Sequence, residues 1–85
     1  MMGEKELLDA AICVGQALSN QIRTKDYLEA TTLQHKGDDI HPGSAIHHPL
    51  YRAVVAHRMA QEDVDKEVRL FAQAWLRYAT LNNIS

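Results

Sequence analysis

The longest stretch without a helix breaker lies in the second half of the chain, where neither glycine nor proline occurs between Leu50 and Leu81. Within it, mostly apolar or aromatic side chains recur at alternating intervals of four and three residues. They are Leu50, Val54, His57, Gln61, Val64, Val68, Phe71, Trp75 and Tyr78. A heptad spacing of this kind places the residues on one side of an α-helix. The sequence therefore predicts a helical region over about 49–81, which Pro49 begins because proline fits the first turn of a helix.

This region forms either one long helix or two helices joined by a tight turn. His57 and Gln61 are polar positions in the apolar spacing, and acidic residues cluster directly after them. Acidic groups favour the start of a helix and basic groups favour its end, so a boundary near Gln61–Asp63 accounts for this order of charges. A single helix accounts for the unbroken spacing and would extend roughly 50 Å at 1.5 Å per residue. The sequence leaves both alternatives open.

The first half of the chain contains a second amphipathic pattern, made of two parallel runs of apolar or small residues. One run is Leu7, Ala11, Val14 and Leu18, and the other is Leu8, Ile12, Gly15 and Ile22. The combined stripe is wide enough to pack against two neighbours and predicts a helix over about 5–22. A weaker pattern predicts a shorter helix over about 25–35, with Thr24 available to cap or separate the two. Turn-forming residues then predict a loop over 36–48.

The length of 85 residues allows a single domain, and 46% hydrophobic with 24% charged residues is an ordinary globular composition. The net charge of -2 lacks the basic excess of general binders of nucleic acid or anionic membranes. Cys13 has no partner for an internal disulfide, and no apolar run reaches the length of a membrane span. We expect a cytoplasmic all-α domain: a small bundle of three or four helices with a long C-terminal amphipathic helix or helix pair, completed by homodimerisation.

The aromatic end of the heptad stripe indicates a function. Tryptophan and tyrosine are enriched at interfaces, and so short a chain has limited room to bury them. We therefore expect a non-catalytic protein-interaction module, such as a small regulatory subunit, adaptor or inhibitor of the kind found in phages and mobile elements. It would bind another protein as well as a second copy of itself. The residues expected to carry the interaction are Val64, Val68, Phe71, Trp75 and Tyr78, with Arg69 and Arg77 on the flank.

Two alternatives remain. The stretch from Gln61 to Arg77 is compatible with a helix-turn-helix DNA-binding regulator, although it lacks the usual turn glycine and carries aromatic residues on the would-be recognition helix. The central loop is rich in histidine, so His41, His47 and His48 are candidate metal ligands, but their spacing matches no structural zinc motif. We find no catalytic signature, and we expect neither enzymatic activity nor a cofactor.

Overall fold

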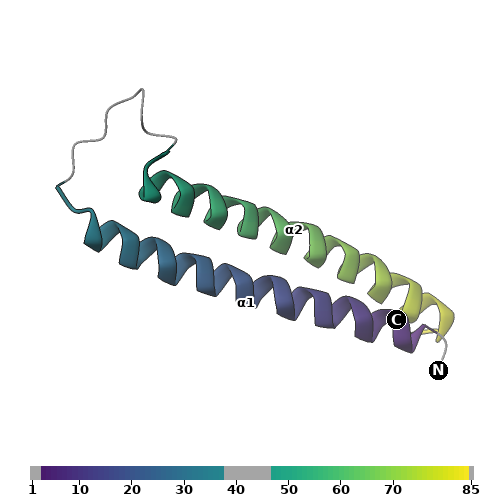
Figure 1. The fold of residues 1–85 in the computed structure, drawn as a ribbon. Coiled ribbons are helices and arrows are strands. Elements are labelled where there is room, and N and C mark those ends of the chain that lie inside the picture. Colours follow the sequence, from purple (N-terminus) through teal and green to yellow (C-terminus); the bar gives the residue numbers. More distant parts are fainter. Residues whose placement is uncertain (1–2, 38–46, 85) are drawn as a thin grey trace.

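The computed structural model describes residues 3–37 and 47–84, which form two long antiparallel helices (Figure 1). Helix α1 comprises Glu4–Gln34 and helix α2 comprises Pro49–Leu81. The helices lie side by side, so the start of α1 is next to the end of α2. The molecule measures 59 × 21 × 18 Å. The all-α class expected from the sequence is confirmed, and the described residues contain no strand.

The number of helices differs from the expectation. Residues 49–81 form one helix, so the turn near Gln61–Asp63 that a helix-turn-helix needs is not formed. The prediction of two helices before the loop is wrong, because α1 continues through residues 22–25 without a break. Thr24 does not cap a new helix there. Its hydroxyl instead donates to the carbonyl of Gln21 at 3.0 Å, as threonine does inside helices. The described residues therefore form two helices, where the sequence suggested three or four.

Local side-chain interactions fix the ends of α2. His48 precedes the helix, and its Nδ1 accepts a hydrogen bond from the backbone N–H of Leu50 at 3.1 Å. Pro49 occupies the first turn, where its missing N–H costs nothing. At the other end, the Asn82 side chain donates to the carbonyl of Tyr78 at 2.8 Å, and Asn83 has a φ of 55°. A left-handed asparagine of this kind commonly follows the last turn of a helix.

The two helices meet along a narrow seam of residues spaced alternately three and four apart. On α1 and its C-cap these residues are Leu7, Ala10, Val14, Ala17, Gln21, Thr24, Leu28, Thr31 and His35. On α2 they are Leu50, Ala53, His57, Ala60, Val64, Glu67, Phe71, Ala74 and Tyr78. Among the described residues only Ala53, Ala60, Ala74 and Thr31 are buried, and all four side chains are small. Small side chains let two helices approach closely, so the helices pack tightly but bury little side-chain volume between them.

The α2 residues of this seam differ at every second position from the stripe that the sequence predicted. Alanines Ala53, Ala60 and Ala74 face α1, whereas the larger neighbours Val54 and Trp75 are exposed. The alanines and their larger neighbours both follow a seven-residue repeat, so the spacing alone cannot say which set faces the other helix. The structure therefore places large apolar side chains beside the seam rather than in it.

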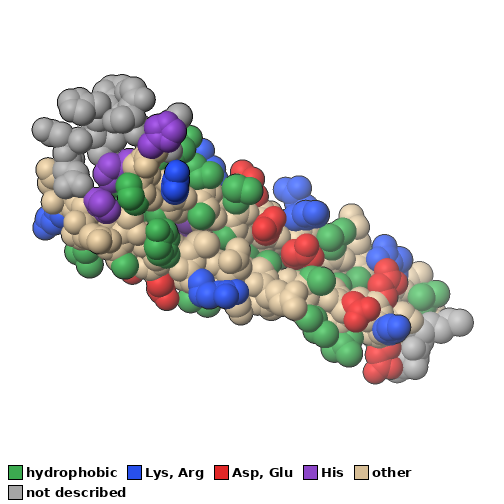
Figure 2. All heavy atoms as spheres, viewed as in Figure 1, with side chains coloured by type: hydrophobic (Ala, Val, Ile, Leu, Met, Phe, Trp, Pro, Cys, Tyr) green, Lys and Arg blue, Asp and Glu red, His purple; other side chains and the backbone are tan. Residues whose placement is uncertain are grey.

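The hairpin exposes far more surface than a compact protein of its mass. Its accessible area is 6569 Å², whereas about 5,100 Å² is typical for 9.6 kDa. Its radius of gyration is 18.6 Å, compared with about 12 Å for a compact chain of this length. No large side chain among the described residues is fully buried, and hydrophobic groups reach the surface in many places (Figure 2). Neither described helix is long and apolar enough to cross a membrane.

Candidate interaction surface

The five apolar residues expected to bind a partner lie on two different sides of α2. Val64, Phe71 and Tyr78 follow one another at seven-residue intervals and are half-buried in the seam. Val68 and Trp75 are also seven residues apart, but they lie beside the seam and are 47% and 43% exposed. Only these last two therefore offer a large accessible area to another molecule.

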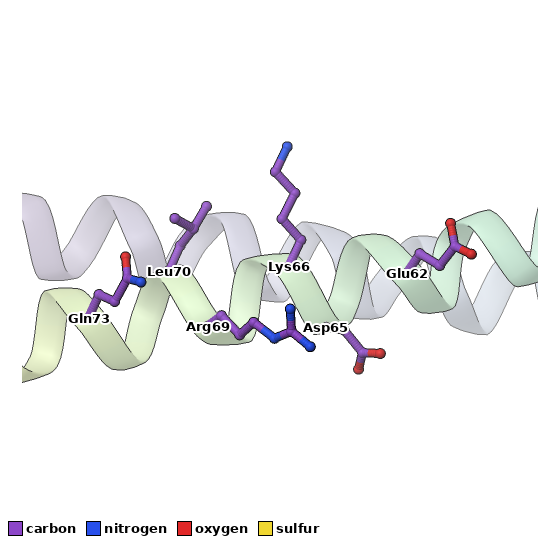
Figure 3. A pocket seen from close by; sticks show the side chains of 6 residues that line it. All are labelled: Glu62, Asp65, Lys66, Arg69, Leu70 and Gln73. Carbon is purple, nitrogen blue, oxygen red and sulfur yellow. The ribbon is translucent and has the colours of Figure 1, made fainter.

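The two expected flanking arginines are separated as well. Arg77 forms an ion pair with Glu6 across the two helices, so it belongs to the contacts within the hairpin. Arg69 lies on the outer side of α2, in a shallow hollow made by side chains of that helix alone. Figure 3 shows its guanidinium extended along the helix in the direction of Asp65, with Lys66 and Leu70 on the other side. Neither arginine borders the surface around Trp75.

The exposed Trp75 belongs to a continuous apolar face that both helices build. We name it the Trp75 face and define it by Leu8, Ala11, Gly15, Leu18 and Ile22 on α1 with Val68, Ala72 and Trp75 on α2. The α1 residues are spaced alternately three and four apart, so they form a second stripe next to the seam. Leu8 and Ile22 at its two ends are 59% and 60% exposed. The sequence contained a signal for this face, because Leu8, Gly15 and Ile22 belong to the second run that broadens the predicted first helix.

Two grooves show that the two stripes lie on the same side of the hairpin. The first has a volume of about 380 Å³ and is lined by Leu8 and Ala11 of α1 and by Trp75 of α2, with Glu4 at its end. The second has a volume of about 350 Å³, and its lining residues are Gln21, Ile22, Lys25, His57 and Gln61. The first groove is mainly apolar, whereas the second carries amide, imidazole and ammonium groups. The Trp75 face therefore runs from an acidic rim at Glu4 to a basic rim at Lys25.

Trp75 is held by an aromatic neighbour. Its ring centroid lies 5.8 Å from that of Tyr78, with an angle of 30° between the two ring planes. Tyr78 itself is half-buried in the seam, so one side of the indole rests on the hairpin while the rest is open. A large, partly supported ring of this kind is a typical anchor residue in protein interfaces.

The opposite edge of the hairpin carries more polar groups, although Tyr27, Met59 and Leu70 are also exposed along it. It carries the Glu6–Arg77 ion pair, the exposed Cys13 and a series of exposed charged or amide side chains. The series comprises Asp9, Gln16, Asn20, Arg23, Asp63, Lys66 and Gln73. This edge and the Trp75 face flank the same seam, and ionic and amide side chains are more frequent along this edge.

The middle of the seam contains a hydrogen bond between the helices. Nδ1 of His57 lies 3.1 Å from the hydroxyl oxygen of Thr24. Because that hydroxyl gives its proton to the carbonyl of Gln21, the pair forms when His57 carries a proton on Nδ1 and donates it. His57 therefore acts as a packing residue with a satisfied donor, and the bond fixes the relative register of α1 and α2.

The candidate metal ligands are not brought together in the part of the chain that can be described. His41 lies outside the described residues. His48 caps α2 through Nδ1, and its ring packs edge-on against His35 with centroids 4.8 Å apart. His47 is exposed. Within residues 3–37 and 47–84, no three histidine, cysteine, aspartate or glutamate side chains are grouped closely enough to hold a metal ion.

Comparisons with known proteins add no further assignment. No family model matches the sequence, and no curated protein or solved structure shows significant similarity to it. The surface geometry is therefore the basis for a functional proposal.

Proposed function

We propose that this protein is a non-catalytic interaction module, such as a small regulatory subunit, adaptor or inhibitor, and that it binds its partner proteins through the Trp75 face. One observation carries the proposal: five large apolar side chains are exposed along one edge of the hairpin, where Leu8 of α1 and Trp75 of α2 line the same groove. Contiguous exposed apolar surface of this kind marks interaction sites in folded proteins. Scattered exposed hydrophobic residues would not carry the same inference.

The composition of the face supports a specific contact. Trp75 supplies an aromatic anchor next to a groove, and aromatic anchors contribute much of the binding energy at protein interfaces. Leu8, Leu18 and Ile22 supply the surrounding aliphatic area. Charged groups at the rim of an interface select partners and orient them more than they add affinity, and Lys25 lies in that position.

Affinity capture with the immobilised full-length chain tests the proposal. Trp75→Ala is expected to weaken retention of any bound protein about 30-fold or more, because truncating an anchor residue costs 2 kcal/mol or more. Gln16→Ala is the matched control, since Gln16 is an exposed residue on the polar edge. Circular dichroism of each variant checks that both helices remain formed.

Two results would contradict the proposal. One is that Trp75→Ala binds the same proteins as the native chain with unchanged affinity. The other is that Gln16→Ala loses binding to the same extent, which would place the interaction on the polar edge. Either result removes the Trp75 face from the function.

A further inference from the structure

We propose that the Trp75 face is occupied by a second copy of this chain, packed face to face and antiparallel, so that two hairpins form a four-helix bundle. The two-fold axis passes near Gly15, where α1 of one copy crosses α1 of the other. This arrangement rests on the proposed function, because it names the partner for the same surface.

The exposed area favours a second copy as the occupant. Each chain exposes about 1,500 Å² more than is typical for its mass. Burial of that excess by both copies gives an interface of about 3,000 Å², which lies within the 2,000–5,000 Å² range of obligate homodimers. A dimer of this size brings the exposed surface closer to that of an ordinary folded protein of its mass. It also encloses a core between four helices, which the two-helix seam does not provide.

The spacing on α1 matches a two-fold axis at Gly15. Leu8 and Ile22 lie seven residues before and seven residues after this position. An antiparallel crossing at Gly15 therefore places Leu8 of each copy over Ile22 of the other. It also brings the small Ala11 next to the large Leu18, so that the two surfaces interlock. A self-complementary pattern is what a two-fold interface requires.

Within the described hairpin, no contact requires a glycine at position 15. It lies in the middle of α1 with helical backbone geometry, where glycine costs about 1 kcal/mol relative to alanine. A Cβ added to it would meet no described atom within 4 Å outside its own helix, so no contact within the chain excludes a side chain. At the crossing point of two helices, the missing side chain lets the backbones approach closely. The dimer therefore explains a residue that the hairpin does not.

The charges select the antiparallel orientation. Glu6 pairs with Arg77 and Thr24 with His57, so α1 and α2 residues whose numbers add up to about 82 lie at the same level. In the antiparallel dimer, Lys25 of one copy lies near Glu4 of the other, and opposite charges meet. In a parallel dimer, α1 of one copy would instead lie over α2 of the second copy. Residues of these two helices whose numbers add up to about 82 would then face each other. Lys25 then lies near Arg58, and two positive charges meet.

The same register gives Trp75 a binding place. An axis at the level of Gly15 and Val68 brings Trp75 to the level of Gln61 and Arg58 on the second copy. That position is next to the second groove, whose lining includes Lys25 and His57. A cationic side chain over the face of an indole ring is favourable, and tryptophan is the best ring for it. Trp75 of each copy thus meets the second groove of the other copy, beside the Trp75 face.

Disulfide trapping of the full chain in a Cys13→Ser background tests the orientation. Single Gly15→Cys and single Val68→Cys variants are each expected to form covalent dimers on oxidation, because each residue lies near the axis. Leu8→Cys alone and Ile22→Cys alone are not expected to do so, whereas a mixture of these two forms a heterodimer. The native chain with Cys13 is the control, since that thiol lies on the polar edge.

Sedimentation equilibrium of two matched variants tests the location. Gly15→Leu places a large side chain at the crossing and is expected to raise the dimer dissociation constant about 5- to 150-fold, the effect of overpacking a closely packed site. Gln16→Leu introduces the same side chain one residue later, on the polar edge, and is expected to leave the dissociation constant within about 2-fold. Circular dichroism confirms that each variant remains helical.

The outcomes separate this arrangement from the proposed function. Preferential trapping of Gly15→Cys with Val68→Cys in a mixture would show a parallel dimer and overturn the antiparallel arrangement, while leaving the function intact. A chain that remains monomeric at every concentration would overturn the second copy as occupant, and capture of a different protein through Trp75 would still support the function. Equal weakening by Gly15→Leu and Gln16→Leu would place the dimer contact elsewhere.

Discussion

Substitution of Ala60 by leucine tests whether the alanine column is the seam between the two helices. Ala60 is only 1% exposed, and it faces α1. Leucine adds three carbon atoms, which would contribute about 0.8 kcal/mol each if space were available. The seam has no such space, so the helices must separate or the side chain must adopt a strained rotamer. Overpacking of this kind costs about 1–3 kcal/mol.

Urea unfolding followed by circular dichroism measures this change at one fixed protein concentration. Ala60→Leu is expected to lower the free energy of unfolding by about 1–3 kcal/mol, and each kcal/mol lowers the Tm by roughly 4–8 °C. Ala56→Leu is the control: it makes the same exchange one turn earlier in α2, at an exposed position, and should change stability by less than about 0.5 kcal/mol. Equal stabilities of the two variants would refute the seam and favour the stripe through Gln61 and Trp75.

Two further substitutions test individual contacts. Thr24→Val removes the hydroxyl that meets His57 and leaves a half-buried imidazole nitrogen without its partner; we expect a loss of about 1–3 kcal/mol in urea unfolding. Thr32→Val is the control, because the exposed Thr32 hydroxyl bonds only within α1, and it should change stability much less. A similar loss in both variants would show that the hydrogen bond between the helices does not stabilise the hairpin. Arg77→Gln breaks the exposed ion pair with Glu6 and is expected to cost less than about 1 kcal/mol, with the difference shrinking in 1 M salt; a larger cost that salt does not reduce would show that the pair is more than a surface contact.

The helical class and the start of α2 follow from local features that the sequence displays directly. Pro49 is tolerated in the first turn of a helix but not in its interior, and the next break in the sequence pattern comes at the asparagines after Leu81. The helix boundaries in the first half of the chain were harder to predict from the sequence. Thr24 has the side chain of a capping residue, and only the surrounding structure shows that its hydroxyl bonds backward within α1 and across to His57.

The proposed interaction surface was partly visible in the sequence. Trp75 and Val68 were among the residues expected to bind a partner, and both are exposed on the Trp75 face. Phe71, from the same list, is half-buried in the seam instead. The contribution of α1, above all Leu8 and Ile22, was visible as a second apolar run. Its position beside Trp75 depends on how the two helices align, which no property of either helix alone determines.

The sequence by itself determined that this chain forms long amphipathic helices with a broad apolar side, because helix formation and its ends depend on neighbours within a few residues. Only the tertiary structure decided which part of that broad side lies between the helices. Two helices pack closely where side chains are small, so Ala53, Ala60 and Ala74 face α1. The larger Trp75 is left beside the seam, because contact between α1 and α2 at the alanines leaves it no room inside.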